Sequence, residues 1–298
     1  MKQQINDLLK PELLNTVNGL ELVARIIVEG FMSGSNRSQS IGVGYEFSQY
    51  RSYEPGDDLR LLDWKMYGRS ERYYIKQSEV ETNITVKFIL DASRSMDYKE
   101  KGISKLQYSK VMIAALGYLA RKQSDTFGLY VVNDQKISMV EPRFEQQQFM
   151  RFLNELLAAK GEGSWGKGKD LEALQRYVGK EMIVFFTDLY DNGSDIQQFV
   201  SRLKTSRNEV IVFHVMGNDE LNLGAEGVFT FEDLETGERR KVDTLEQRRA
   251  YTKKVNEWLQ QSRSWMLEKQ IDYHLVRMNH TVESVLVHFL NSRKRLFR

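Results

Sequence analysis

The sequence predicts an α/β fold in which a mostly parallel, doubly wound sheet is flanked by helices, preceded by an N-terminal helix and a β-rich extension. After residue 83, apolar strand-like segments alternate with segments whose apolar residues recur at three- and four-residue steps. Residues 84–90 are almost continuously apolar, which is typical of a strand covered on both faces. The 298-residue chain, 41% hydrophobic and 28% charged, is long and apolar enough to bury such a core.

Residues 1–82 are predicted to form the N-terminal region. Apolar positions between residues 3 and 31 recur at helical spacing, and Pro11 marks a helix start. The Gly- and Ser-rich residues 31–44 predict an exposed loop. Residues 73–80 predict a strand, so that helix and β structure together make up this region.

Residues 83–298 are predicted to form the α/β domain, with a more polar, inserted stretch at about 217–243 that holds a short strand at 227–232. The pattern of alternating elements favours a parallel sheet with helices on both faces. Its predicted strands are 84–90, 127–133, 136–140, 182–187, 209–215 and 271–276, and its predicted helices are 105–122, 146–159, 171–178, 196–204, 244–269 and 282–291.

Composition excludes several classes of function. The 43 Lys and Arg residues nearly balance the 41 Asp and Glu residues, so no whole-molecule field attracts nucleic acid. The chain has no cysteine, which removes thiol nucleophiles and cysteine-bound zinc. The longest strongly apolar stretch, residues 111–120, is well short of the ~20 residues of a membrane-spanning helix, and the N-terminus lacks a secretory signal pattern. We therefore expect a cytoplasmic protein without a membrane span.

Two predicted strands end in acidic residues, at the edge of the sheet where open α/β folds bind ligands. Asp91 follows the first strand and is itself followed by Ser93 and Ser95, and Asp188 closes a later strand. A carboxylate and two hydroxyls on one tight loop, with a second carboxylate beside them, suit the oxygen coordination of Mg²⁺. By themselves, however, an Asp and two serines at a strand end equally fit helix capping.

The motif resembles the von Willebrand factor type A fold, whose metal-ion-dependent adhesion site uses Asp-x-Ser-x-Ser, a later Thr and a later Asp. Asp91, Ser93 and Ser95 match its first element, and Asp188 matches its last. The resemblance implies a site in which Mg²⁺ is held by these four residues and a carboxylate of a protein partner completes its coordination.

The chain also resembles the bacterial family called domain of unknown function 58, through Gly44 to Trp64 and through the Asp-Leu-Glu-Thr-Gly-Glu segment at 233–238. The resemblance implies a non-enzymatic partner of MoxR-type AAA ATPases. Pro55-Gly56 sets a turn in the first segment, and Trp64 is expected to bury itself against the sheet. We interpret this segment as a docking motif rather than a hydrolytic carboxylate set, with partner-binding candidates Tyr45, Phe47, Tyr50, Arg51, Tyr53, Asp57, Asp58, Arg60, Asp63 and Trp64.

One position departs from the adhesion-site pattern. The family's Thr lies in a Gly-Thr-Asp-Leu-like segment, and the matching residues here are Gly168, Lys169, Asp170 and Leu171. An ammonium group cannot ligate Mg²⁺. Either Lys169 turns away from the ion, or its ammonium itself pairs with Asp91 and Asp188, and the sequence leaves both alternatives open.

The sequence offers two enzymatic alternatives to the adaptor. Residues 161–168 nearly match a phosphate-binding loop, but Gly168 stands where the hydroxyl ligand is needed, so no nucleotide is expected. The alternative function is a Mg²⁺-dependent phosphohydrolase of the haloacid dehalogenase type, which also places an Asp at a strand end. That chemistry needs a carboxylate two residues later, where this chain has Ser93. We therefore favour a non-enzymatic adaptor.

Overall fold

The computed structural model describes residues 11–35, 47–54, 62–78, 84–134, 137–165, 180–191, 195–224 and 227–296. The chain divides into two compact units, one made of Met1–Phe31 with Ile84–Arg298 and the other of Met32–Asn83. The sequence grouped residues 1–82 together, whereas in the structure the residues up to Phe31 belong to the unit that contains the main sheet.

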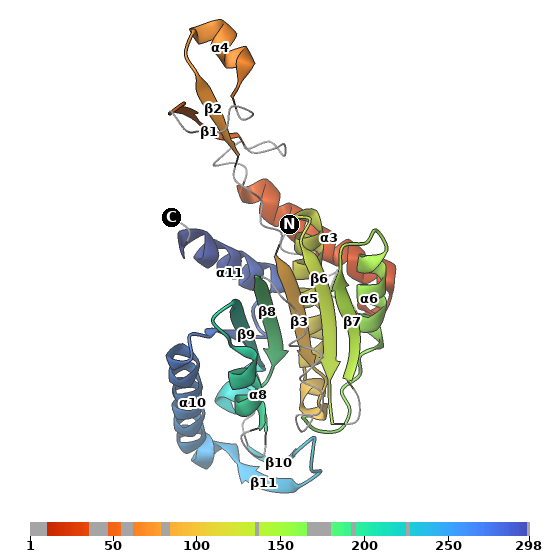
Figure 1. Cartoon of the computed structure of the whole chain (residues 1–298). Coiled ribbons are helices and arrows are strands. Elements are labelled where there is room, and N and C mark those ends of the chain that lie inside the picture. Colours follow the sequence, from red (N-terminus) through yellow and green to blue (C-terminus); the bar gives the residue numbers. More distant parts are fainter. Residues whose placement is uncertain are drawn as a thin grey trace. The chain divides into compact units, whose positions relative to one another are not determined.

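The main unit is built on a six-stranded sheet with the order β12-β9-β8-β3-β6-β7 (Figure 1). All neighbouring strands are parallel except β7, which runs antiparallel to β6 at one edge. All residues of the central strand β3 are buried. The predicted class, an α/β fold with a mostly parallel doubly wound sheet, is therefore confirmed. The strands are β3 (Thr85–Asp91), β6 (Thr126–Val132), β7 (Ile137–Arg143), β8 (Glu181–Thr187), β9 (Asn208–Met216) and β12 (Asp272–Arg277).

Helices cover both faces of this sheet. On one face, α8 (Asp195–Leu203) and α10 (Thr244–Glu268) pack on a cluster that includes Ile89 and Phe185. On the other, α6 (Gln148–Ala158) brings Phe152 to 5.6 Å from Phe88, and α11 (Val282–Leu296) brings Phe289 to 5.0 Å from Phe213, measured between ring centroids. Helix α5 (Lys105–Lys122) occupies the same face as α6 and begins in a capping box formed by Ser104 and Gln107.

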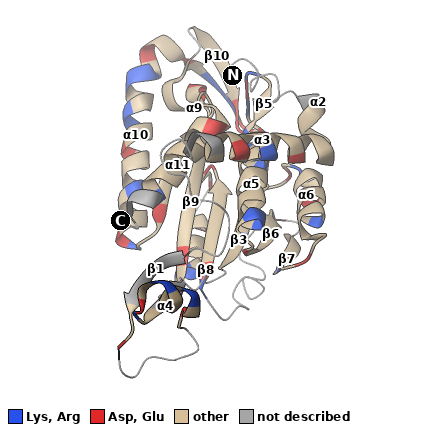
Figure 2. Ribbon diagram, turned by 90° about the horizontal axis from the view of Figure 1, so that it is seen from above, with Lys and Arg blue, Asp and Glu red and all other residues tan. Residues whose placement is uncertain are grey.

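The N-terminal helix differs from its prediction in two ways. It is broken into α2 (Pro11–Leu14) and α3 (Val17–Ser35), because Thr16 Oγ1 accepts a hydrogen bond from Gly19 N and starts a new helix. Helix α3 also continues through Ser35, so the predicted loop at 31–44 was wrong for its first residues. The buried side chains of α3 face the main unit, and Glu29 accepts a hydrogen bond from Tyr118 of α5, beside which α3 lies (Figure 2).

The second unit pairs β1 (Phe47–Ser52) with β2 (Tyr74–Ser78) in antiparallel order and holds α4 (Trp64–Ser70) between them. Asp63 caps α4 by accepting hydrogen bonds from two backbone N–H groups. Trp64 is 64% exposed, so its predicted burial was wrong. Trp64 starts a short helix without any buried residue, and its ring meets Tyr67 edge-on at 6.3 Å between centroids.

The inserted stretch at 217–243 contains more structure than predicted. The short strand is present as β10 (Val228–Glu232), and it pairs with a second strand, β11 (Arg239–Asp243), that the sequence analysis missed. A short helix, α9 (Asn218–Asn222), precedes this hairpin. The β10–β11 hairpin lies at the edge of the main sheet where the parallel strands end (bottom of Figure 1).

Candidate strand-end site

Asp91 is the centre of the candidate site. It closes β3 and is fully buried. One carboxylate oxygen, Oδ1, accepts a hydrogen bond from Ser93 N at 2.9 Å, which is the local turn that Asp favours. The other, Oδ2, accepts a hydrogen bond from Thr187 Oγ1 at 2.7 Å. Burial, reinforced by the negative charge of Asp188, raises the pKa of Asp91 to about 7.

Ser93 and Ser95 place two buried hydroxyls beside this carboxylate. Ser93 stands at the N-cap position of the 3₁₀ helix Arg94–Asp97 without a capping hydrogen bond from its side chain, and its Oγ is hydrogen-bonded to Ser95 Oγ at 3.0 Å. Two adjacent ligands of an octahedral Mg²⁺ at ~2.0–2.1 Å stand about 2.9 Å apart. The hydrogen bond between the hydroxyls explains their spacing, and two ligands of one Mg²⁺ ion would have a similar spacing.

Asp188 and Thr187 reach the site from the neighbouring strand. Because β8 runs parallel to β3, with Leu90 opposite Phe186, both strands end at the same level. The backbone then turns through Leu189, whose φ of 54° is left-handed. In that turn Thr187 Oγ1 accepts a hydrogen bond from Leu189 N, and Asp188 Oδ1 accepts one from Tyr190 N. The turn thus holds both side chains in place.

Lys105, which belongs to none of the sequence motifs, is the cation that pairs with Asp188. Its Nζ lies 2.6 Å from Asp188 Oδ2 and 2.8 Å from Glu220 Oε1, with only 2% of the side chain exposed. It also lies 5.4 Å from the centre of the Tyr98 ring. Burial by itself lowers the pKa of Lys105, but the two carboxylates outweigh it and raise the pKa above its ordinary value. Lys105 therefore remains charged.

A signal for this role existed in the sequence. Lys105 is the first residue of α5, next to the capping Ser104. A positive charge at a helix N-terminus is opposed by the helix dipole, so a lysine there calls for acidic partners elsewhere in the fold. Those partners lie 83 and 115 residues along the chain, which no local pattern reveals.

The turn of the β10–β11 hairpin adds a further carboxylate. Asp233 Oδ1 accepts hydrogen bonds from Glu235 N and Thr236 N, both at 2.9 Å. The hydroxyl of Tyr190 donates a hydrogen bond to the other oxygen, Asp233 Oδ2. Glu235 interacts with the Ser95 hydroxyl and with the charges of Asp188 and Asp91. Burial first, and then these two carboxylates, raise the pKa of Glu235 to about 7.

The four predicted metal-site residues, Asp91, Ser93, Ser95 and Asp188, thus come together at one edge of the sheet. Lys169 and Asp170 lie outside the described residues, as do Tyr45, Asp57, Asp58 and Arg60. Phe47, Tyr50 and Arg51 lie on β1, where only the backbone is described. Tyr53, Asp63 and Trp64 belong to the second unit, in which the Tyr53 ring meets the edge of Tyr73 at 6.3 Å between centroids.

The chemistry of these groups decides how they would hold a metal ion. Within the described ranges, no three His, Asp or Glu side chains are grouped closely enough to hold an ion by themselves. The site fits Mg²⁺ in another way, because this ion keeps several waters and accepts hydroxyl oxygens. Ser93 and Ser95 would ligate it directly, and the Asp91 and Asp188 carboxylates would bind its waters.

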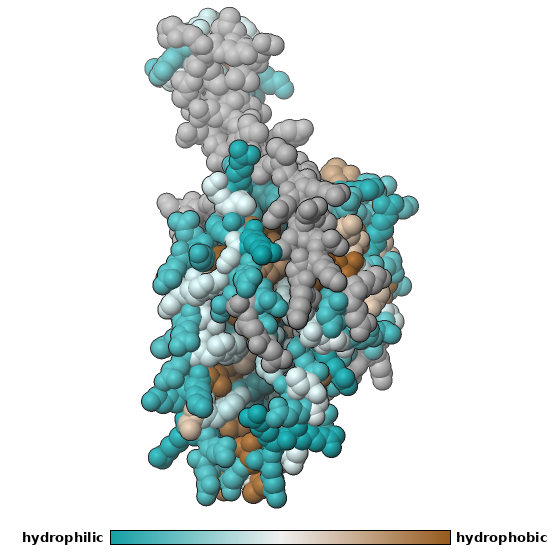
Figure 3. All heavy atoms as spheres, turned by 60° about the horizontal axis from the view of Figure 1, so that its bottom comes forward, coloured by the Kyte–Doolittle hydropathy of each residue, from teal (hydrophilic) through white to brown (hydrophobic). Residues whose placement is uncertain are grey.

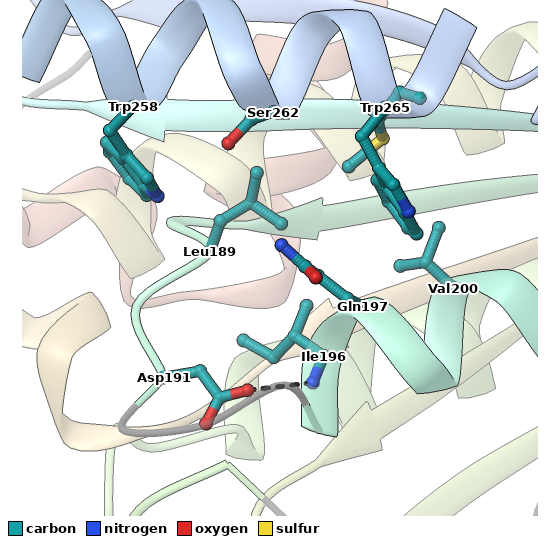
Figure 4. Close-up of a pocket in the computed structure, with 9 residues that line it drawn as sticks. Leu189, Asp191, Ile196, Gln197, Val200, Trp258, Ser262 and Trp265 are labelled. Carbon is teal, nitrogen blue, oxygen red and sulfur yellow. Dashed lines mark hydrogen bonds between the residues drawn. The ribbon is translucent and has the colours of Figure 1, made fainter. Parts of the chain in front are cut away.

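A second concave feature lies between α8 and α10 (Figure 4). Trp258 and Trp265 project from α10 toward Leu189 and Gln197, while Asp191 Oδ2 accepts a hydrogen bond from Ile196 N at 2.9 Å. Its volume of about 70 Å³ is far below the ~300 Å³ of a small ligand site. We therefore regard it as a packing cavity, and the strand-end site remains the functional candidate.

No helix in the described part of the chain is both long and apolar enough to cross a bilayer.

The chain is similar to several known proteins. Residues 49–261 match the sequence profile of the family described as "Protein of unknown function DUF58". Uncharacterized proteins Mb1516 of Mycobacterium bovis and Rv1480 of Mycobacterium tuberculosis are each 24% identical over 236 residues, which cover 78% of this chain and 74% of theirs.

Solved structures with a related arrangement share little sequence with this chain. An aerotolerance-related membrane protein from Bacteroides fragilis is 17% identical, with 70% of this chain and 97% of the other covered and a TM-score of 0.41. BatB from Bacteroides thetaiotaomicron is 14% identical, with 71% and 99% covered and a TM-score of 0.40. The VWA domain of SpRpn10 is 12% identical, with 69% and 94% covered and a TM-score of 0.38.

Proposed function

Since this chain belongs to the DUF58 family of proteins, we propose that it is a non-enzymatic, cytoplasmic adaptor that binds a protein partner through the strand-end site. The partner is a MoxR-type AAA ATPase or the protein on which that ATPase acts. A von Willebrand factor A-like fold suits such a role, because its sheet edge presents a small polar site on a rigid scaffold.

The observation that carries this proposal is the convergence of Asp91, Ser93, Ser95 and Asp188 at one end of the sheet. The Asp91 carboxylate is held by the Ser93 N–H and the Thr187 hydroxyl, the Asp188 carboxylate is held by the Lys105 ammonium, and the two serine hydroxyls are hydrogen-bonded to each other. A site whose groups are already oriented loses little conformational freedom on binding.

We further propose that Mg²⁺ links this site to the partner. The carboxylates of Asp91 and Asp188 repel each other, and Lys105 is engaged with Asp188 and Glu220 rather than with Asp91. When bound, the ion supplies the positive charge that lets a partner's carboxylate approach. Ser93 and Ser95 would hold it, while Lys105 keeps the Asp188 side chain oriented through its hydrogen bond to Oδ2.

The residue two positions after Asp91 argues against the phosphohydrolase alternative. That reaction needs a carboxylic acid at this position to protonate the leaving group. Ser93, two residues later, offers a hydroxyl in place of a general acid. The arrangement supports binding rather than catalysis.

Calorimetric titration with Mg²⁺ and Mn²⁺ tests the site directly. We expect saturable binding by the natural protein and its loss in Asp91→Ala, because that variant removes the central carboxylate. Glu257→Ala, which removes an exposed carboxylate of α10, is the matched control and should bind as the natural protein does. Equal binding by Asp91→Ala would show that the ion sits elsewhere, and no binding by the natural protein would refute the metal-bridged site.

Co-sedimentation with the purified MoxR-type ATPase of the same organism tests the partner. We expect a complex that forms in Mg²⁺, dissociates in EDTA and fails to form with Asp91→Ala. If the complex withstands both EDTA and the Asp91→Ala substitution, the partner binds to a surface other than the strand-end site. No complex under any condition would refute this partner.

A further inference from the structure

We propose that Glu235, at the turn of the β10–β11 hairpin, is an internal ligand of the strand-end site that takes the place a partner's carboxylate must occupy. This inference rests on the proposed function, because it assigns the chain's own hairpin to the same position as the partner. A partner would then have to displace the hairpin in order to bind.

The first support is the way the hairpin turn is held over the site. Asp233 fixes the turn by accepting hydrogen bonds from Glu235 N and Thr236 N. The Tyr190 hydroxyl donates to the other oxygen of Asp233, and Tyr190 follows Asp188 by two residues. The turn is therefore tied to the loop that carries one of the site's own carboxylates.

The second support is the state of the Glu235 carboxylate. Its Oε1 is buried, and the described residues offer it no hydrogen-bond partner. The side chain interacts with the Ser95 hydroxyl, and its charge lies close enough to those of Asp91 and Asp188 to be repelled by them. A buried carboxylate oxygen without a partner is unfavourable, and a cation at the strand-end site would satisfy it.

The third support is that Lys105, the described cation nearest Asp188, is engaged elsewhere. Its ammonium is bonded to Asp188 and Glu220. A cation shared with Glu235 would therefore sit on the side of Asp91, Ser93 and Ser95. Those residues contribute the hydroxyl pair whose spacing fits a magnesium shell.

The fourth support is that the two strands of the hairpin bury little surface, so that the turn is held mainly by the hydrogen bonds of Asp233. All five residues of β10 are exposed, and neither β10 nor β11 pairs with another described strand. Hydrophobic atoms lie among polar ones on the end of the molecule turned forward in Figure 3, and Phe229 and Phe231 are 41% and 42% exposed. A two-stranded hairpin with so little burial opens at small cost, so a partner can displace it.

The test compares Glu235→Gln with Glu238→Gln. Each variant replaces one carboxylate of the hairpin by an amide of the same shape. Glu238 is the control, because its side chain is 61% exposed and pairs with Arg240. Mn²⁺ alone is the probe, and its binding is measured by electron paramagnetic resonance. We expect Glu235→Gln to weaken Mn²⁺ binding about tenfold, as the loss of one supporting ligand does, and Glu238→Gln to leave it unchanged.

Hydrogen exchange of the turn amides at 233–238 gives a second readout. Mn²⁺ should slow their exchange in the natural protein and in Glu238→Gln, but not in Glu235→Gln. Glu235→Asp, which keeps the charge on a shorter side chain, should retain part of the protection. Circular dichroism of each variant separates loss of a ligand from loss of the fold.

The outcomes distinguish this inference from the proposed function. Strong Mn²⁺ binding that Glu235→Gln leaves unchanged, with no protection of the turn, would overturn the internal ligand and leave the adaptor proposal standing. Absence of Mn²⁺ binding by the natural protein would overturn both. If Glu235→Gln and Glu238→Gln weaken Mn²⁺ binding equally, the loss of one negative charge anywhere on the hairpin explains the effect. That result would also overturn the internal ligand.

Discussion

At the scale of single residues, the strand-end site is an arrangement of charges that only partly compensate one another. Lys105 neutralises Asp188 on one side, where Glu220 completes the contact. On the other side, the Glu235 carboxylate is repelled by the charge of Asp91, and its buried Oε1 has no hydrogen-bond partner among the described residues. This asymmetry is the physical reason for assigning cation binding to the side of Asp91.

Replacement of the buried ammonium tests this charge balance. Lys105→Met should lower the free energy of unfolding by about 3–5 kcal/mol, because it leaves Asp188 buried without its partner. Urea denaturation followed by circular dichroism measures the change. The control, Lys122→Met at the exposed end of the same helix, should change it by less than about 0.5 kcal/mol. If both variants unfold at similar urea concentrations, the structural role of Lys105 is contradicted.

At the scale of elements, close packing of α5 against α6 positions the loop that carries the site. Gly117 of α5 lies directly beneath the buried ring of Phe152, and a Cβ at this position would approach Phe152 Cε1 to 2.8 Å. Phe152 in turn packs on Phe88 of β3, the strand that ends in Asp91. A side chain on Gly117 would therefore disturb the contact between helix and sheet.

A pair of glycine substitutions tests that contact. Gly117→Ala should destabilise the protein by about 1–3 kcal/mol, because overpacking outweighs the gain in helix propensity. Gly30→Ala in α3 should stabilise it by about 0.5–1 kcal/mol, since the nearest atom to its Cβ would be 3.9 Å away. Thermal unfolding of the two variants gives the comparison. Stabilisation by Gly117→Ala would show that Phe152 can move aside.

At the scale of the whole molecule, the sheet topology brings three distant segments to one edge. Asp91 ends the first strand of the main sheet, Asp188 follows β8, and Glu235 arrives on the inserted hairpin. A ligand that bridges these segments favours the folded state over the unfolded chain, in which they are far apart. Stability should therefore depend on the ligand's concentration.

Mg²⁺ should accordingly raise the melting temperature. At one hundred times its dissociation constant the ion should add about 2.7 kcal/mol to the free energy of unfolding, and EDTA should reverse the effect. Differential scanning calorimetry measures the shift, with Asp91→Ala as the variant expected to show none. KCl at matched ionic strength serves as the control. An equal shift in Asp91→Ala would place the stabilising ion away from this site.

The sequence by itself determined the elements of the main unit and the motif of the site. Continuous apolar character predicted β3 as a strand covered on both faces, and helical spacing predicted α5 over the residues where it occurs. Asp91, Ser93, Ser95 and Asp188 could be recognised because ligand groups follow the ends of parallel strands. These features depend on neighbours along the chain.

Only the tertiary structure decided which charges meet. Lys105 pairs with residues 83 and 115 positions away, and Glu235 reaches the site on a hairpin whose second strand the sequence analysis missed. The exposure of Trp64 likewise could not be predicted from the sequence. The burial of a side chain on a short helix depends on which surfaces that helix packs against, and the residues of the helix do not specify them. Electrostatic and packing contacts between distant segments carry no local periodicity, so they become apparent only when the chain is folded.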